Sequence, residues 1–100
     1  MKLRFTANAL RRITQISDYY NDTGNPKKGR HITRQILARS EELEEYPELG
    51  PEEENLREVE SGHRSLFVGA AYKIIYLIAT PFIIITDIFD TRQDPNKMKS

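Results

Sequence analysis

The sequence predicts an α+β fold in which an N-terminal strand and an antiparallel helical hairpin precede a mainly antiparallel sheet of three to four strands. Three observations support this prediction: polar and apolar residues alternate over 2–5, apolar residues follow helical spacing over 7–46, and apolar runs crowd 63–95. The chain has 100 residues, 38% of them hydrophobic, which suits one modest core. We therefore expect residues 1–100 to form a single domain.

The first predicted elements are a short strand and a helix. The strand covers Lys2 to Phe5, and Thr6 is placed to cap the helix because its hydroxyl can accept a hydrogen bond from a first-turn amide. The helix continues to about Tyr20. Its predicted buried stripe, spaced three or four positions apart, comprises Leu10, Ile13, Ile16 and Tyr20.

A turn and a second helix follow. Gly24 can adopt the left-handed conformation that ends a helix, and Asn25 with Pro26 is typical of the start of the next one. We expect this helix to run from Pro26 to about Tyr46, where Pro47 stops it. The residues predicted to face inward are Ile32, Ile36, Leu37 and Leu43.

The remaining elements are predicted strands separated by short turns. After an exposed loop rich in Pro, Gly and Glu, the expected strands are Leu56 to Glu60, Arg64 to Val68, Tyr72 to Ala79 and Phe82 to Phe89. Such short links favour an antiparallel meander.

The strand from Tyr72 to Ala79 is apolar on both faces. One face carries Tyr72, Ile74, Tyr76 and Ile78, and the other carries Lys73, Ile75, Leu77 and Ala79. Two helices can cover only one side of a small sheet, so we expect the second face to be uncovered and to meet a partner. A charge at Ile75 should then weaken partner binding more than folding. Without a partner, we expect self-association into a homodimer through the uncovered face, favoured by an apolar edge strand at 82–88.

The charges are segregated although the formal net charge is zero. Residues 1–40 carry a net charge of +7, residues 41–60 carry −9, and residues 61–100 carry +2. Faces of opposite sign direct a charged partner to one side of the molecule.

Several classes of protein are excluded. The chain has no cysteine for a disulfide or a thiolate metal site, no apolar run long enough to span a membrane, and no signal peptide, so we expect a cytoplasmic protein that does not contact a membrane. No cofactor-binding motif is present. Asp87, Asp90 and Asp94 fall on a strand end and a loop, so no metal site is expected, and His31 and His63 are expected at the surface.

The order of elements, together with several short motifs, resembles the RelE/ParE superfamily of toxins from bacterial type II toxin-antitoxin modules. The motifs lie between Phe5 and Pro95 and are LxxYPELG, LR, HRSL, YKIIY and IFDTRQDP. The resemblance implies a small toxin that a cognate antitoxin neutralises by wrapping the helical hairpin and the sheet. We place antitoxin binding at Ile75, Tyr76, Leu77, Phe82 and Ile84.

The superfamily implies two mechanisms. RelE-like members cleave messenger RNA on the ribosome without a metal, whereas ParE-like members inhibit DNA gyrase. If this chain is RelE-like, the resemblance places its candidate catalytic residues at Arg64, Tyr72, Lys73 and Arg92. These residues supply cations and a hydroxyl, but the terminal segment has no histidine to act as acid or base and carries Phe89 and Asp90 there instead.

The terminal motif and the near-neutral charge favour the ParE-like branch, because a protein that binds among ribosomal phosphates is usually strongly basic. Two alternatives stay open: a ribosome-dependent endoribonuclease, and a non-toxic binding module whose apolar sheet serves only assembly.

Overall fold

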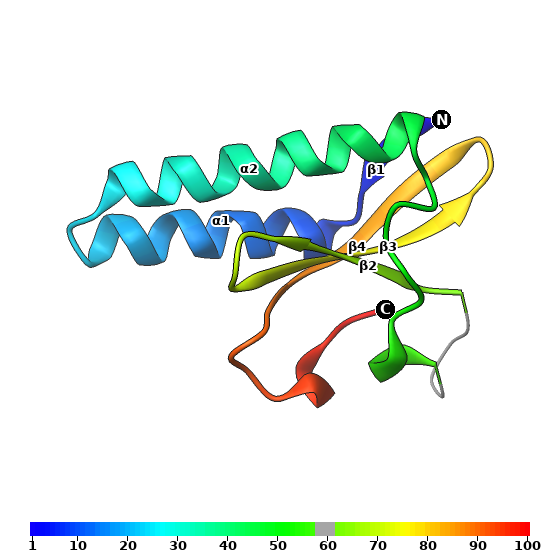
Figure 1. The fold of residues 1–100 in the computed structure, drawn as a ribbon. Helices are drawn as coiled ribbons and strands as arrows, with labels where there is room; N and C mark the ends of the chain where they lie inside the picture. The colour runs from blue at the N-terminus through cyan, green and yellow to red at the C-terminus, as the bar shows by residue number, and fades with distance from the viewer. Residues whose placement is uncertain (58–61) are drawn as a thin grey trace.

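The computed structural model, which describes residues 1–57 and 62–100, contains a four-stranded sheet with two helices packed along one face (Figure 1). In chain order the elements are β1 (Lys2–Phe5), α1 (Ala7–Asp22), α2 (Pro26–Glu45), the 3-10 helix η1 (Glu54–Leu56), β2 (Arg64–Val68), β3 (Tyr72–Ala79), β4 (Phe82–Asp90) and the 3-10 helix η2 (Pro95–Lys97). The sheet order is β1-β4-β3-β2, with β1 parallel to β4 and the other neighbours antiparallel. Because β4 lies between β1 and β3, the predicted edge position of 82–88 is wrong. The predicted α+β architecture is confirmed.

Helix α1 begins where the sequence predicts but presents a slightly different stripe to the core. The Thr6 hydroxyl accepts a hydrogen bond from Ala9 N at 3.1 Å and so caps the helix. Leu10 is 53% exposed, so its predicted inward position is wrong, and the fully buried Ala9 takes that place. Ala9 lies four residues before Ile13, which keeps both side chains on the face toward the sheet.

Helix α2 also keeps its predicted bounds, and its stripe is partly as expected. Gly24 has φ +76°, the left-handed conformation that ends α1, and α2 starts at Pro26. Ile36 and Leu43 are fully buried, but Leu37 is 43% exposed and its predicted inward position is wrong. Ser40 is buried between them and donates its hydroxyl hydrogen to Ile36 O at 2.7 Å, which satisfies that polar group inside the core.

A β-bulge changes which side chains of β4 face the helices. The register between β3 and β4 shifts at Ile75/Tyr76, where Thr86 is the extra residue between the pairs Tyr76↔Ile85 and Ile75↔Asp87. As a result Ile83, Ile85 and Ile88 all belong to the core beneath the helices. Without the bulge, strict alternation would turn Ile88 away from that core.

The face of the sheet away from the helices is partly covered by the chain itself. Ile75 is fully buried there in a cluster with Leu56, Phe89 and Met98, so the prediction of an uncovered second face is wrong at this end of the sheet. The covering segments are η1 and the C-terminal segment, which lie below the sheet in Figure 1. Leu77, Phe82 and Ile84, farther along the same face, remain half-buried.

Two further expectations differ from the structure. Leu56 belongs to η1 and not to a strand, and the rest of the predicted strand 56–60 lies mostly outside the described residues. His63 is 1% exposed, so its predicted surface position is wrong, whereas His31 on α2 is exposed as expected.

Candidate functional site

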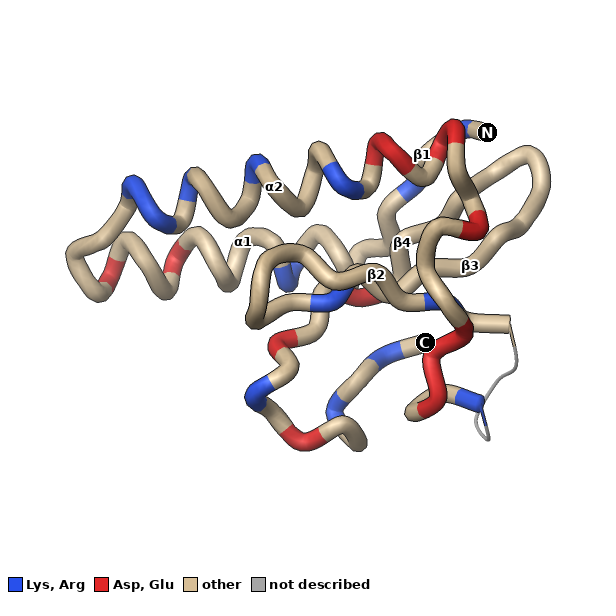
Figure 2. Tube along the Cα trace, in the orientation of Figure 1, with Lys and Arg blue, Asp and Glu red and all other residues tan. Residues whose placement is uncertain are grey.

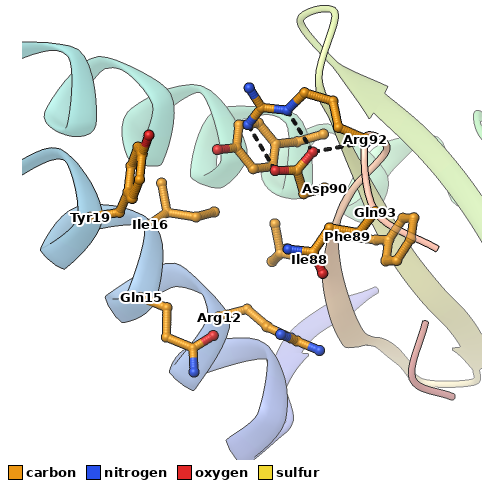
Figure 3. A pocket seen from close by; sticks show the side chains of 10 residues that line it. Arg12, Gln15, Ile16, Tyr19, Ile88, Phe89, Asp90, Arg92 and Gln93 are labelled. Atoms are coloured by element: carbon orange, nitrogen blue, oxygen red, sulfur yellow. Dashed lines mark hydrogen bonds and ion pairs between the residues drawn. The ribbon is translucent and has the colours of Figure 1, made fainter. Parts of the chain in front are cut away.

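A cleft of about 350 Å³ lies between α1 and the C-terminal end of β4 (Figure 3). One wall comes from α1 and the other from the ends of β3 and β4 with the turn that follows. The lining residues are Arg12, Gln15, Ile16, Tyr19, Tyr72, Ile88, Phe89, Asp90, Arg92 and Gln93. Two of the four predicted catalytic residues, Tyr72 and Arg92, therefore share this cleft.

Arg92 is held at the cleft by Asp90. The Arg92 Nε and Nη2 donate to the two carboxylate oxygens of Asp90 at 2.9 and 2.8 Å, and the Arg92 backbone N–H donates at 2.9 Å (Figure 3). The hydrogen bond from Arg92 lowers the pKa of Asp90, and the bond to Asp90 raises the pKa of Arg92. The Arg92 side chain is 65% exposed, so this bidentate pair fixes the guanidinium while leaving it accessible.

Tyr72 also lines this cleft and is 8% exposed. Burial, together with a hydrogen bond involving Tyr20, raises the pKa of Tyr72 to about 12. The phenol is therefore neutral at physiological pH, and its hydrogen bond with Tyr20 links this wall of the cleft to α1.

Lys73 is the neighbour of Tyr72 along β3 and lies on the opposite face of the sheet. Its Nζ donates to Glu53 Oε1 at 2.8 Å and lies 5.2 Å from the centre of the Phe67 ring. Glu53 is only 2% exposed. Burial raises the pKa of Glu53, but hydrogen bonds from Lys73, Asn55 and Ser65 outweigh it, so the net shift is downward.

Arg64 anchors the loop that follows α2. Its Nη1 donates to Gly50 O at 2.7 Å, and the hydroxyl of Tyr76 donates to Pro47 O at 2.7 Å and accepts from Gly50 N at 2.9 Å. These bonds fix residues 47–50 against the end of the sheet. Arg64 is thus engaged far from Arg92, and the three predicted cations do not converge on one site.

The residues expected to bind an antitoxin divide into two groups. Ile75 and Tyr76 are fully buried inside the chain, so their predicted exposure is wrong. Leu77, Phe82 and Ile84 are half-buried, and the Arg4 guanidinium lies 4.9 Å from the Phe82 ring centre. Among these five residues, a partner can therefore reach those at the end near the β3–β4 turn, while Phe67 on β2 is also exposed on the second face at 56%.

The contacts of Asp87 beside the cleft were not anticipated from the sequence. Asp87 is fully buried and accepts hydrogen bonds from Asn8 Nδ2 at 3.1 Å, Arg12 Nε at 3.2 Å and Lys99 N at 2.8 Å. It therefore ties β4 to α1 and to the C-terminal segment. An acidic residue within the apolar run IIITDIF is the signal that points to such a buried ion pair.

Asp87, Asp90 and Asp94, the acidic residues of the terminal segment, have separate partners. Asp87 pairs with Arg12, Asp90 pairs with Arg92, and Asp94 accepts from Asn96 N at 3.0 Å. Within 1–57 and 62–100, no three acidic, histidine or cysteine side chains gather as a metal site would require.

Residues 3–95 match the family described as the ParE toxin of the type II toxin-antitoxin system, parDE. This chain belongs to the ParE toxin family. It is the toxin of a type II toxin-antitoxin module, and membership of the family implies a cognate antitoxin as a partner. The RelE/ParE resemblance inferred from the sequence is confirmed, on the ParE-like side.

A solved structure has the same fold. The "Chromosomal ParDE TA system from P. aeruginosa" superimposes with a TM-score of 0.74 at 20% sequence identity, covering 90% of this chain and 95% of that one. No curated protein matches the chain. Neither α1 nor α2, the long helices of the described residues, has the length and hydropathy needed to cross a membrane.

Proposed function

We propose that this ParE toxin arrests bacterial growth by binding DNA gyrase in the cytoplasm, and that its cognate antitoxin neutralises it by covering part of the sheet. The observation that carries the proposal is the match to the ParE toxin family over residues 3–95. Inhibition by binding needs an accessible surface and does not need an acid, a base and a cation cluster.

The arrangement of the predicted catalytic residues supports binding over cleavage. Metal-free RNA cleavage requires cations around the reacting phosphate and nearby groups that transfer protons. Lys73 is paired with the buried Glu53, and Arg64 is bonded to Gly50 O. Only Arg92 with Tyr72 remains in an open cleft, so a single cation is available there among the four candidates.

Antitoxin binding is proposed for the exposed end of the second face. Leu77, Phe82 and Ile84 are half-buried apolar side chains next to one another on the paired strands β3 and β4. Apolar side chains of this kind gain stability when a partner segment removes them from water.

The test is a DNA supercoiling assay with purified gyrase and the purified toxin. We expect the toxin to inhibit supercoiling and its complex with the antitoxin to leave supercoiling unchanged. Growth arrest in cells with supercoiling unaffected in the assay would contradict gyrase as the target.

One observation favours the second candidate function, ribosome-dependent mRNA cleavage. Tyr72 and the exposed Arg92 lie in the same cleft, where a phosphate and a stacked base have room to bind. This function predicts translation-dependent cuts in mRNA that disappear in Arg92→Ala, with intact mRNA as the result that rules it out. Expression of the chain alone without any growth arrest would favour the non-toxic binding module instead.

A further inference from the structure

A second pocket, with a volume of about 510 Å³, lies at the end of α2 near the N-terminus and the last residues of β3. We name it the helix-end pocket. The residues that form it and carry the inference are Met1, Glu45, Tyr46, Glu48, Leu49 and Ile78. It lies apart from the cleft that contains Tyr72 and Arg92, and it shares no residue with it.

The helix-end pocket exposes an unusual amount of apolar surface. Tyr46 is 62% exposed, Leu49 is 45% exposed and Met1 is 41% exposed, whereas the neighbouring Ile78 is half-buried against the core. Three of the large apolar side chains that this chain exposes thus surround one concavity. A concave apolar surface of this size has room for a side chain as large as Leu or Phe.

The rim of the helix-end pocket is acidic. Glu45 and Glu48 line it, and neither forms an ion pair with another residue that the structure describes. Glu41 and Glu44 are exposed on the preceding turns of α2, and Figure 2 shows acidic residues concentrated at this end of the helix. The helix dipole adds negative potential at the same place. One positive group lies nearby, because the Met1 ammonium donates to Glu44 O at 2.9 Å.

We propose that the helix-end pocket binds a cationic amphipathic segment of a partner protein. One apolar side chain of the segment enters between Tyr46, Leu49 and Ile78, and Lys or Arg residues on either side pair with Glu45 and Glu48. The apolar anchor supplies most of the affinity, and the charges select a basic partner and orient it. This inference goes beyond the proposed function, since it depends neither on gyrase nor on toxicity.

The experiment begins with selection of random peptides displayed on phage, using the purified full-length chain as bait. We expect the selected peptides to share an apolar residue flanked by Lys or Arg. A selected peptide is then synthesised with a fluorescent label, and its affinity for purified variants is measured by anisotropy at low and high salt.

Two variants and two matched controls test the two parts of the pocket. Leu49→Ser should weaken binding by about tenfold or more, because it removes the apolar wall. The double change Glu45→Gln with Glu48→Gln should weaken binding roughly threefold to fivefold at low salt and reduce its salt dependence. Leu10→Ser and Asp22→Asn make the same kinds of change on exposed positions of α1 and should leave the affinity unchanged.

Circular dichroism on each variant separates loss of binding from loss of folding. Should Leu49→Ser fail to fold, the charge variants still test the pocket, since Glu45 and Glu48 are exposed. The proposal is overturned if selection yields acidic peptides or none, or if the selected peptide binds the pocket variants as tightly as the parent chain. Sedimentation showing self-association that Leu49→Ser abolishes would assign the pocket to a second copy of the chain and would also overturn it.

Discussion

Ile75 has no exposed surface in the folded chain, because Leu56, Phe89 and Met98 enclose it on the face of the sheet away from the helices. The sequence placed it on an open docking face, where a charge would weaken partner binding more than folding. In the structure a charge at this position would be removed from solvent, and the described residues of the surrounding cluster include no basic side chain to pair with it.

We therefore predict that Ile75→Glu lowers the free energy of unfolding by more than about 3 kcal/mol. Urea unfolding followed by circular dichroism measures the change. Leu77→Glu, the matched control on the same face of β3, introduces the charge at a half-buried position and should cost less than about 1 kcal/mol. Equal unfolding midpoints for the two variants would contradict the enclosure of Ile75.

The pair of Glu53 and Lys73 makes stability depend on pH. The net shift lowers the pKa of Glu53 below the ordinary value of 4.5, so the charged form is favoured in the folded chain. The resulting stabilisation is fully present above the unfolded pKa and is lost as the pH falls through the lowered folded pKa.

Lys73→Met should reduce this acid dependence. Burial alone would raise the pKa of Glu53, and the hydrogen bond from Lys73 is the largest of the interactions that lower it. Urea unfolding at a series of pH values from 6 downward, spanning the unfolded pKa of 4.5, measures the slope of the unfolding free energy against pH for the parent chain and the variant. Arg57→Met, which removes a cation from an exposed ion pair, is the control and should keep the parent slope. Identical slopes for Lys73→Met and the parent would show that the pair does not stabilise the fold.

The loop that follows α2 packs directly against the sheet at Gly50. Gly50 packs so closely that a Cβ atom added there would lie 2.3 Å from Ser65 O and 3.0 Å from Tyr76 Cε1. Backbone atoms cannot move aside as the end of a flexible side chain can. The contact holds the loop against β2 and β3.

We predict that Gly50→Ala lowers the free energy of unfolding by about 2–3 kcal/mol and loosens the loop, through the steric overlap with Ser65. Thermal unfolding and amide hydrogen exchange of residues 47–53 measure the two effects. Gly24→Asn is the control: nothing lies within 4 Å of an added Cβ, and Asn tolerates its φ of +76°, so the cost should stay below about 1 kcal/mol. Normal exchange protection in Gly50→Ala would contradict the role given to this contact.

For the whole molecule, the two faces of the sheet are covered by different parts of the chain. The helices cover one face, while η1 and the C-terminal segment cover only the Ile75 end of the other. Part of the apolar surface that stays accessible on this second face lies at Leu77, Phe82 and Ile84, and there we propose that the antitoxin binds.

Binding of the antitoxin to the folded toxin should raise its stability by mass action, by about 2.7 kcal/mol when free antitoxin is in roughly hundredfold excess over Kd. We predict that the double change Leu77→Glu with Ile84→Glu removes most of this increase, as measured by thermal unfolding with and without the purified antitoxin. Ala70→Glu, which places a charge in an exposed turn, should retain it. An unchanged stabilisation in the double variant would place the antitoxin elsewhere.

The sequence by itself determined the two helices with their bounds, the family resemblance, the first strand and the three strands from Arg64 onward. Those features depend on local patterns: capping at Thr6, the break at Gly24 and Pro26, and apolar spacing within each segment. The family resemblance named Tyr72 and Arg92 as catalytic candidates, but the cleft that they share, where β3 begins and β4 ends, was not predicted.

Only the tertiary structure decided which surfaces are open and which charges are engaged. The bulge at Thr86, the return of Met98 over Ile75, and the pairing of Lys73 with Glu53 join residues that are far apart in the chain. Periodicity assigns a side chain to a face of its own element but does not state what packs against that face. Long-range packing therefore fixed the exposed end of the sheet and the helix-end pocket, and no pattern within a single segment contains that information.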